Sequence, residues 1–155
     1  MLVQMVIRPP RNPYPNDLSQ NGSVCQFGGK DYVKSVFTIN NEKSEKLSCL
    51  FFQPKTEQRP QEKMPAVIYM HGNAGCKQEA EELAPFLLTQ GINLFAFDFS
   101  GCGHSDGEWV TLGWKERKDL DAVLNHLNSL GTVSKIGLWG RSMGASTSIM
   151  FTADN

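Results

Sequence analysis

The sequence predicts an α/β fold, in which helices cover a largely parallel sheet. Two observations carry this prediction. From Met64 onward, short apolar runs alternate with stretches of helical periodicity, which is typical of strand–helix–strand units. Near the end, the apolar run 135–139 leads into Gly140-Arg141-Ser142-Met143-Gly144, and small residues follow at 145–150. A strand, a sharp turn and a helix in this order make G-x-S-x-G a candidate nucleophile elbow.

The composition fits one globular domain. At 155 residues, with 40% apolar content, the chain is long enough for a packed core but not for two domains. The net charge of −1 comes from charges of mixed sign, which argues against a nucleic-acid partner. No stretch approaches the ~20 apolar residues of a membrane span. The apolar start at 1–7 contains Gln4 and is cut by Arg8-Pro9-Pro10, unlike a signal peptide, so we expect a cytoplasmic protein.

The four cysteines show no metal-ligand spacing. By number alone they allow two disulfides. In a chain without a secretory signal, free thiols in a reducing compartment are the better expectation. We expect neither a metal nor a cofactor.

The first part of the chain is predicted to lie outside the parallel region. Residues 1–30 are rich in Pro, Asn, Gly and Ser after the first few positions, and we expect an extended arm over the surface. Residues 31–155 are expected to form the domain. Within it, 32–39 and 47–52 are rich in β-branched and aromatic residues and flank the turn-forming segment 40–45, which predicts a hairpin.

The parallel region is predicted from Met64 onward. Its strands are expected at 66–70, 92–97 and 136–139, and the continuous apolar runs at 66–70 and 92–97 suggest that these two strands are buried on both faces. One helix is expected over 78–90, with Pro85 as a point where it can split and Gly91 as its C-terminal glycine. A second helix, ending at Gly131, is marked by apolar residues on one face, namely Leu120, Val123, Leu124, Leu127 and Leu130.

Ser142 is the candidate nucleophile. A serine hydroxyl attacks a carbonyl only when a base takes its proton, and an elbow presents it at the carboxyl end of a strand. Gly140 and Gly144 allow the strand and helix to approach closely, and the Met143 backbone N–H is one oxyanion donor in this geometry. The alternative is a serine on a strand–turn–helix connection without chemistry.

A second motif, His71-Gly72-Asn73-Ala74-Gly75, follows the strand that ends at Met70. Acyl transfer needs a second N–H directed at the developing oxyanion, and we assign it to the Asn73 backbone. Gly72 allows the backbone to face the substrate. His71 is expected to hydrogen-bond the loop rather than to act as the base.

A third, glycine-rich segment follows the strand that ends at Phe97. It lacks the lysine of a P-loop and the spacing of a dinucleotide fingerprint, so we expect a tight turn held by the Asp98 side chain. His104, in this loop, is the one histidine expected to face the same sheet edge as Ser142. His126 is expected on a helix, in a solvated or packing position.

These three motifs, in this order and on these elements, resemble the α/β-hydrolase superfamily. The subset they resemble most is the serine aminopeptidase-like hydrolases, near the acyl-protein thioesterase branch. The stretch Ile7-Arg-Pro-Pro-Arg11 with Tyr14 is also similar to the N-terminal arm of such proteins in protists. The resemblance implies a three-layer α/β-hydrolase fold. Of the family's sheet, this chain is expected to supply about five strands, the first two antiparallel, and to stop after the elbow helix.

The resemblance also implies a serine hydrolase that cleaves an ester, thioester or amide of a small-molecule, acyl or peptidyl substrate through an acyl-enzyme on Ser142. The family's acid and histidine come later in the sequence, and all three histidines here precede Ser142. We therefore expect this chain alone to be inactive. It would need a complementing C-terminal half, or it would aggregate through the exposed sheet edge at 136–139. The alternative is a non-catalytic, truncated or decayed paralogue that acts as a binding protein.

Overall fold

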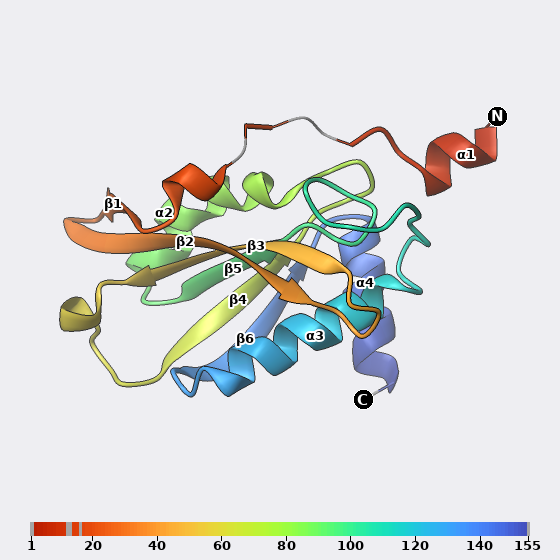
Figure 1. Ribbon diagram of the computed structural model, residues 1–155. Coiled ribbons are helices and arrows are strands. Elements are labelled where there is room, and N and C mark those ends of the chain that lie inside the picture. Colours follow the sequence, from red (N-terminus) through yellow and green to blue (C-terminus); the bar gives the residue numbers. More distant parts are fainter. Residues whose placement is uncertain (1, 12–13, 16, 155) are drawn as a thin grey trace.

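A computed structural model describes residues 2–11, 14–15 and 17–154. Its centre is a six-stranded sheet with the strand order β1-β2-β3-β5-β4-β6 (Figure 1). One apolar cluster packs α2 and the preceding 3₁₀ turns on one face of this sheet, and a second packs α3 and α4 on the other. The expected three-layer arrangement is therefore confirmed.

The N-terminal half of the sheet is antiparallel. Strands β2 (Lys30–Asn40) and β3 (Lys46–Pro54) form the predicted hairpin, with Val36 opposite Leu50. The Asn41 side chain closes its turn, because Asn41 Oδ1 accepts the backbone N–H groups of Lys43 and Glu45. This is the local bonding that makes asparagine a turn residue.

The C-terminal half is parallel at β5 (Asn93–Phe97), β4 (Met64–Met70) and β6 (Val133–Gly140). All five residues of β5 are buried, as expected for a strand covered on both faces. Strand β6 lies at the end of the sheet, and its residues alternate between half-buried and exposed. Trp139 on this edge is 43% exposed.

The helices begin and end near the predicted positions. The expected helix over 78–90 is split into 3₁₀ turns at Lys77–Leu83 and helix α2 at Ala84–Thr89, with Pro85 in the first turn of α2. Gly91, at φ +77°, and Ile92 donate to the carbonyls of Leu88 and Leu87, which is the Schellman ending of a helix. Helix α3 spans Glu116–Ser129, and helix α4 spans Met143–Asp154. None of the helices in the described ranges is long and apolar enough to cross a membrane.

The N-terminal thirty residues are not uniformly extended, which corrects the sequence-based expectation. Residues Leu2–Ile7 form helix α1, and Asp17–Gln20 form a 3₁₀ turn. Residues Ser23–Phe27 form strand β1, which pairs antiparallel with β2. Gly28 and Gly29, at φ +56° and +75°, make the tight connection. The sheet therefore has six strands rather than five, and its first three, β1 to β3, are antiparallel.

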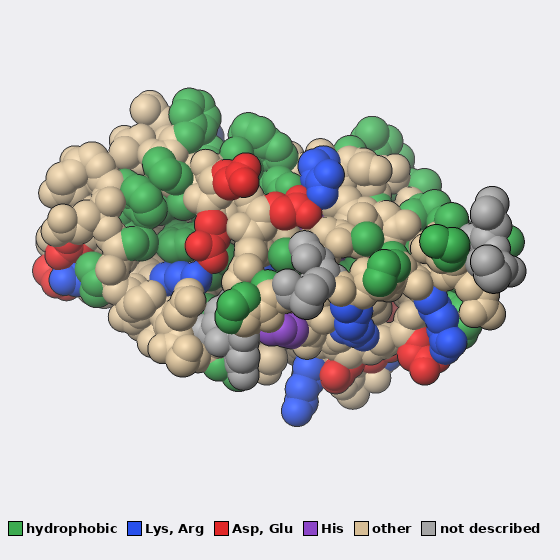
Figure 2. Space-filling model, turned by 90° about the horizontal axis from the view of Figure 1, so that it is seen from above, with side chains coloured by type: hydrophobic (Ala, Val, Ile, Leu, Met, Phe, Trp, Pro, Cys, Tyr) green, Lys and Arg blue, Asp and Glu red, His purple; other side chains and the backbone are tan. Residues whose placement is uncertain are grey.

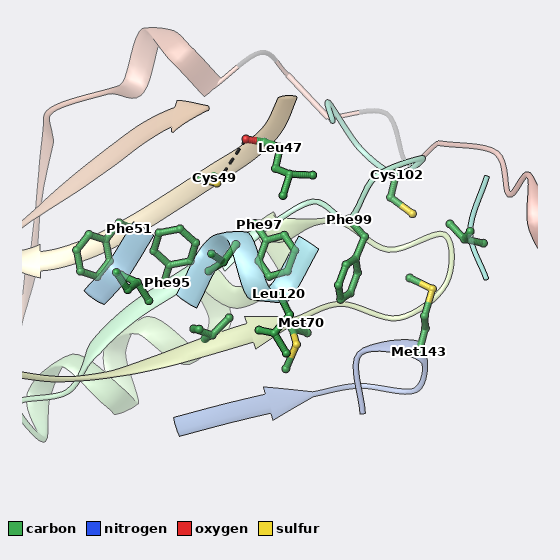
Figure 3. Packing of buried hydrophobic residues seen from close by; sticks show 14 residues of the cluster. Leu47, Cys49, Phe51, Met70, Phe95, Phe97, Phe99, Cys102, Leu120 and Met143 are labelled. Atoms are coloured by element: carbon green, nitrogen blue, oxygen red, sulfur yellow. Dashed lines mark hydrogen bonds between the residues drawn. The ribbon is translucent and has the colours of Figure 1, made fainter. Parts of the chain in front are cut away.

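The core below the candidate site is aromatic and sulfur-rich. Phe97 and Phe99 pack edge to face at 4.8 Å between ring centroids. Figure 3 shows Met143 and Met70 directed into the same cluster, so the turn after β6 is anchored in the core. On the face seen from above, which carries the N-terminal arm, side chains of both charges are interspersed with apolar ones (Figure 2).

Candidate active site

Ser142 lies on a strained turn between β6 and α4. Its φ is +51°, in the left-handed region that non-glycine residues rarely adopt, and its side chain is exposed. Helix α4 begins at the next residue, Met143. The predicted order of strand, sharp turn and helix is thus confirmed, and the backbone strain is of the kind that persists where the surrounding structure imposes it.

Two glycines make this turn possible. A Cβ at Gly140 would lie 2.3 Å from the Ala145 backbone nitrogen, and a Cβ at Gly144 would lie 2.2 Å from the Met70 carbonyl oxygen. Real Cβ contacts are more than 1 Å longer, so neither position has room for a side chain. The close approach expected of Gly140 and Gly144 is therefore present in the structure.

The elbow is tied to the neighbouring strand β4. The Arg141 backbone N–H donates to the Met70 carbonyl at 3.0 Å. The Arg141 guanidinium donates to both carboxylate oxygens of Glu79, at 3.0 and 2.8 Å, and the Tyr69 hydroxyl donates to the same carboxylate at 2.8 Å. Burial raises the pKa of Glu79, but the hydrogen bonds from Tyr69 and Arg141 outweigh it, and the net pKa is lowered.

The His71–Gly75 loop lies directly beside the elbow. Strands β4 and β6 are parallel neighbours in which Met70 is opposite Gly140, so the two loops leave the same sheet edge together. A Cβ at Gly72 would touch the Arg141 side chain at 3.4 Å, and one at Gly75 would lie 2.4 Å from a Glu79 carboxylate oxygen. The predicted neighbourhood of the two strands is confirmed. The convergence of the Asn73 and Met143 N–H groups on one volume stays a prediction.

His71 has a structural environment. The ring is fully buried, its Nδ1–H donates to the Gly72 carbonyl at 2.7 Å, and its Nε2 accepts the Phe99 N–H at 3.1 Å. Burial lowers the pKa of His71, so the neutral form with a proton on Nδ1 is favoured. Both ring nitrogens are engaged with the backbone, which agrees with the role expected from the sequence.

The rings of the other two histidines pack against neighbouring aromatic rings. The His104 ring stacks on Tyr14, with centroids 4.0 Å apart, and His126 on α3 packs against Phe37 at 5.2 Å. Burial lowers the pKa of His126. No histidine in the described part of the chain is within hydrogen-bond distance of the Ser142 hydroxyl.

The glycine-rich loop is the tight turn that the sequence predicts. The Asp98 carboxylate accepts the backbone N–H groups of Lys77 and His104, at 2.7 and 2.9 Å. A Cβ at Gly103 would lie 2.3 Å from this carboxylate. Within residues 2–11, 14–15 and 17–154, no three His, Cys, Asp or Glu side chains are grouped so as to hold a metal ion.

Sequence reasoning missed the Glu79–Arg141 pair and the burial of Lys77. Glu79 follows the His71–Gly75 motif and Arg141 lies within the elbow motif, and only the adjacency of β4 and β6 makes these two charges partners. Lys77 is 0% exposed although its surrounding sequence is polar. The sequence gives one sign of this burial: Lys77 lies next to Cys76, which directly follows the His71–Gly75 motif.

Comparison with known proteins gives consistent results. A family model described as "alpha/beta hydrolase fold" matches residues 65–155, more than half of the chain. The uncharacterized protein YfhR of Salmonella typhimurium is 30% identical over 96 residues, which are 61% of this chain and 32% of that protein.

Solved structures share this fold as well. The esterase Pf2001 of Pyrococcus furiosus superposes with a TM-score of 0.67 at 32% identity, over 92% of this chain and 51% of that chain. The structure of Est1E from Butyrivibrio proteoclasticus with ferulic acid bound gives a TM-score of 0.65 at 26% identity, over 76% of this chain and 47% of that chain. This chain thus spans about half the length of these solved chains and about a third of the curated relative. The elbow, the sheet and these matches agree: the chain belongs to the α/β hydrolase fold family.

Proposed function

We propose that Ser142 is the nucleophile of a serine hydrolase that cleaves an ester, thioester or amide bond through an acyl-enzyme. The observation that carries the proposal is the strained, exposed turn at Ser142, where φ is +51° at the carboxyl end of β6. The likeness to the esterase Pf2001 supports the reaction class. Strain at a surface serine stabilises nothing in the fold, which favours a chemical reason for it.

In the proposed reaction, Ser142 Oγ attacks the carbonyl carbon of the substrate while a base takes the hydroxyl proton. The oxygen of the tetrahedral intermediate carries the negative charge. The Asn73 and Met143 backbone N–H groups are the proposed donors to it. When the carbon–heteroatom bond breaks, the alcohol, thiol or amine leaves with a proton. Water then attacks the acyl-enzyme, releases a carboxylic acid and regenerates Ser142.

The base is proposed to come from outside the described residues. His71 has both ring nitrogens bonded to backbone, His126 packs on α3, and His104 stacks on Tyr14. Loss of the base costs several orders of magnitude in triad enzymes. We therefore expect residues 1–155 alone to hydrolyse p-nitrophenyl acetate no faster than the Ser142→Ala variant. Turnover well above that control would show that this chain supplies a base of its own.

The nucleophile position is testable even without a base. A cysteine is a few per cent thiolate near pH 7, and the thiolate attacks activated esters without a general base, so Ser142→Cys should be acylated by p-nitrophenyl acetate with release of p-nitrophenolate. The matched control is Ser148→Cys, two turns further along α4 in a half-buried position. For each variant, the acylation rate is divided by the rate of alkylation with iodoacetamide. This ratio removes differences in exposure and in thiol pKa, because only acylation passes through an oxyanion.

We expect a ratio at position 142 at least ~10-fold higher than at position 148, since one oxyanion donor is worth roughly 10²–10³ in rate in an intact enzyme. Substitution of Gly75 by Ala, whose Cβ would lie 2.4 Å from a Glu79 carboxylate oxygen and 2.9 Å from the Gly72 carbonyl oxygen, should displace the Asn73 loop and lower the ratio at position 142. Equal ratios at the two positions would contradict the oxyanion proposal and favour a non-catalytic binding protein.

A further inference from the structure

Residues 8–11, which follow α1, lie beside the glycine-rich loop of the candidate active site (Figure 1). Among them, the Arg11 guanidinium donates to four backbone carbonyls of the glycine-rich loop. The oxygens belong to Cys102, Gly103, Ser105 and Gly107, at 3.1, 2.9, 2.5 and 2.7 Å. Three of these oxygens share the two N–H groups of Nη1, and the fourth accepts from Nη2, so the contact with Gly107 uses the second arm of the guanidinium fork.

Tyr14 bridges a buried ion pair on the same loop. The Lys77 ammonium and the Asp98 carboxylate are both 0% exposed, and their N–O distance of 3.8 Å is too long for a hydrogen bond. The Tyr14 hydroxyl lies between them. It donates to Asp98 Oδ2 and accepts from Lys77 Nζ at 2.7 Å. An N-terminal residue therefore completes the contact between two buried charges that follow two different strands.

The Asp98 carboxylate also holds both loops by their backbones. The N–H of Lys77, just after the Asn73 loop, and the N–H of His104, in the glycine-rich loop, donate to its two oxygens. The position of this carboxylate thus sets the distance between the two loops. Tyr14 donates a hydrogen bond to the same carboxylate and stacks on His104, so it is a third group that restrains Asp98, beside the N–H groups of Lys77 and His104.

The last residues of α1 contact Asn73 and the neighbouring loop directly. The Asn73 side-chain Nδ2–H donates to the Val6 carbonyl at 3.1 Å, while Asn73 Oδ1 is buried without a hydrogen-bond partner. The Ile7 carbonyl accepts the Val110 N–H at 2.8 Å. A buried oxygen without a hydrogen bond costs free energy, which opposes this position of the Asn73 side chain. The hydrogen bond to the Val6 carbonyl holds the side chain in place nevertheless.

We propose that residues 6–11 together with Tyr14 form a positioning strap of the candidate active site, in which the Tyr14 hydroxyl fixes the Asn73 loop relative to the glycine-rich loop. The proposal rests on the proposed function only in treating the Asn73 loop as part of an active site. Tyr14 is a positioning residue: it acts through Asp98 and Lys77 and touches no reacting atom. The strap joins the loops that follow β4 and β5. It does not determine the order of these two strands in the sheet.

The test compares two tyrosine variants of the full chain. Tyr14→Phe removes the bridging hydroxyl and keeps the ring that stacks on His104. The matched control is Tyr32→Phe, since the Tyr32 hydroxyl is also buried and donates one hydrogen bond, to the Leu88 carbonyl at 2.8 Å. Two readouts are recorded: amide hydrogen exchange by residue, and the position of the Asn73 side-chain amide signals in ¹⁵N NMR spectra, assigned with Asn73→Asp.

We expect Tyr14→Phe to speed exchange at the Lys77 and His104 amides at least ~10-fold over the change at the β2–β3 amides, which is the scale of one lost buried hydrogen bond. The Asn73 side-chain signals should shift in this variant and stay in place in Tyr32→Phe. Catalysis enters neither readout, so an error in the proposed function would not change the result.

An even rise in exchange over the whole sheet would mean that Tyr14 only adds global stability, and it would overturn the proposal. Unshifted Asn73 signals in Tyr14→Phe would also overturn it. If Tyr14→Phe does not fold, Arg11→Lys serves instead. A lysine ammonium cannot span the four carbonyls, so exchange at residues 101–107 and the Asn73 signals should then change together. A change at 101–107 without a shift of the Asn73 signals would likewise overturn the proposal.

Discussion

Substitution of Gly144 by alanine is expected to destabilise the fold strongly, although alanine is the better helix former. A Cβ at Gly144 would lie 2.2 Å from the Met70 carbonyl oxygen. Since comfortable carbon contacts begin near ~3.4 Å, the start of α4 would have to move by roughly 1 Å. That movement strains the Gly144–Arg141 hydrogen bond of 3.0 Å, which closes the elbow.

The net effect follows from two opposing contributions. Crowding of a packed site costs about 1–3 kcal/mol, and here the obstacle is a main-chain carbonyl that cannot rotate away, so the upper end applies. Replacing glycine by alanine inside a helix returns up to about 1 kcal/mol. We therefore expect Gly144→Ala to lose about 2 kcal/mol in the free energy of unfolding, or roughly 4–8 °C in Tm for a chain of this size.

The matched control is Gly137→Ala on β6. A Cβ there would lie 3.5 Å from a Val67 methyl carbon, which is an ordinary contact, and an interior strand glycine costs roughly 0.5–1 kcal/mol relative to alanine. Urea unfolding of both variants, followed by circular dichroism, measures the two free energies. A Gly144→Ala variant as stable as the parent would refute the close approach of α4 to β4. So would an equal loss in both variants.

Three further outcomes are expected. Ser142→Gly should be more stable to urea than Ser142→Ala by about 1 kcal/mol, because φ is +51° at this position; equal stability would contradict the strain. Burial lowers the pKa of His71 below 6.5, so the unfolded chain binds the extra proton first. Stability should therefore be complete above pH 6.5 and fall as the pH is lowered, by at most ~1.4 kcal/mol per pH unit. His126 contributes with the same sign, and urea midpoints of the His126→Gln variant at pH 7.5 and 5.5 isolate the His71 contribution. Among the four free thiols, half-buried Cys25 should react first with a disulfide reagent at pH 7.5, because burial raises the pKa of Cys102 to about 12.

The parts of the fold that follow from local chemistry could be predicted from the sequence. Gly91 and Gly131 end helices because both adopt positive φ, at +77° and +67°, which costs glycine little. Pro85 divides the helical stretch because it has no backbone N–H to donate. The turn around Asp98 was predicted from a short side chain that bonds nearby backbone.

The parts that were missed depend on partners far along the chain. Strand β1 is exposed at most of its positions and is defined by its pairing with β2, so its own residues carry little signal. Lys77 is buried because Tyr14, Ser48 and Asp98 surround it, and these three residues come from three separate segments. No pattern within a short window encodes such a site.

The relation between the nucleophile and the oxyanion loop depends on one strand end. The Met70 carbonyl accepts the Arg141 N–H, and it also sets the limit that excludes a side chain at Gly144. The loop with Asn73 begins at the residue directly after β4. A displacement of β4 therefore moves both loops together. Acyl transfer to the Ser142→Cys thiol should for this reason depend on residues 70–79 and 140–144, and it should be unchanged in a His126→Gln variant, because His126 lies on α3 and packs against Phe37.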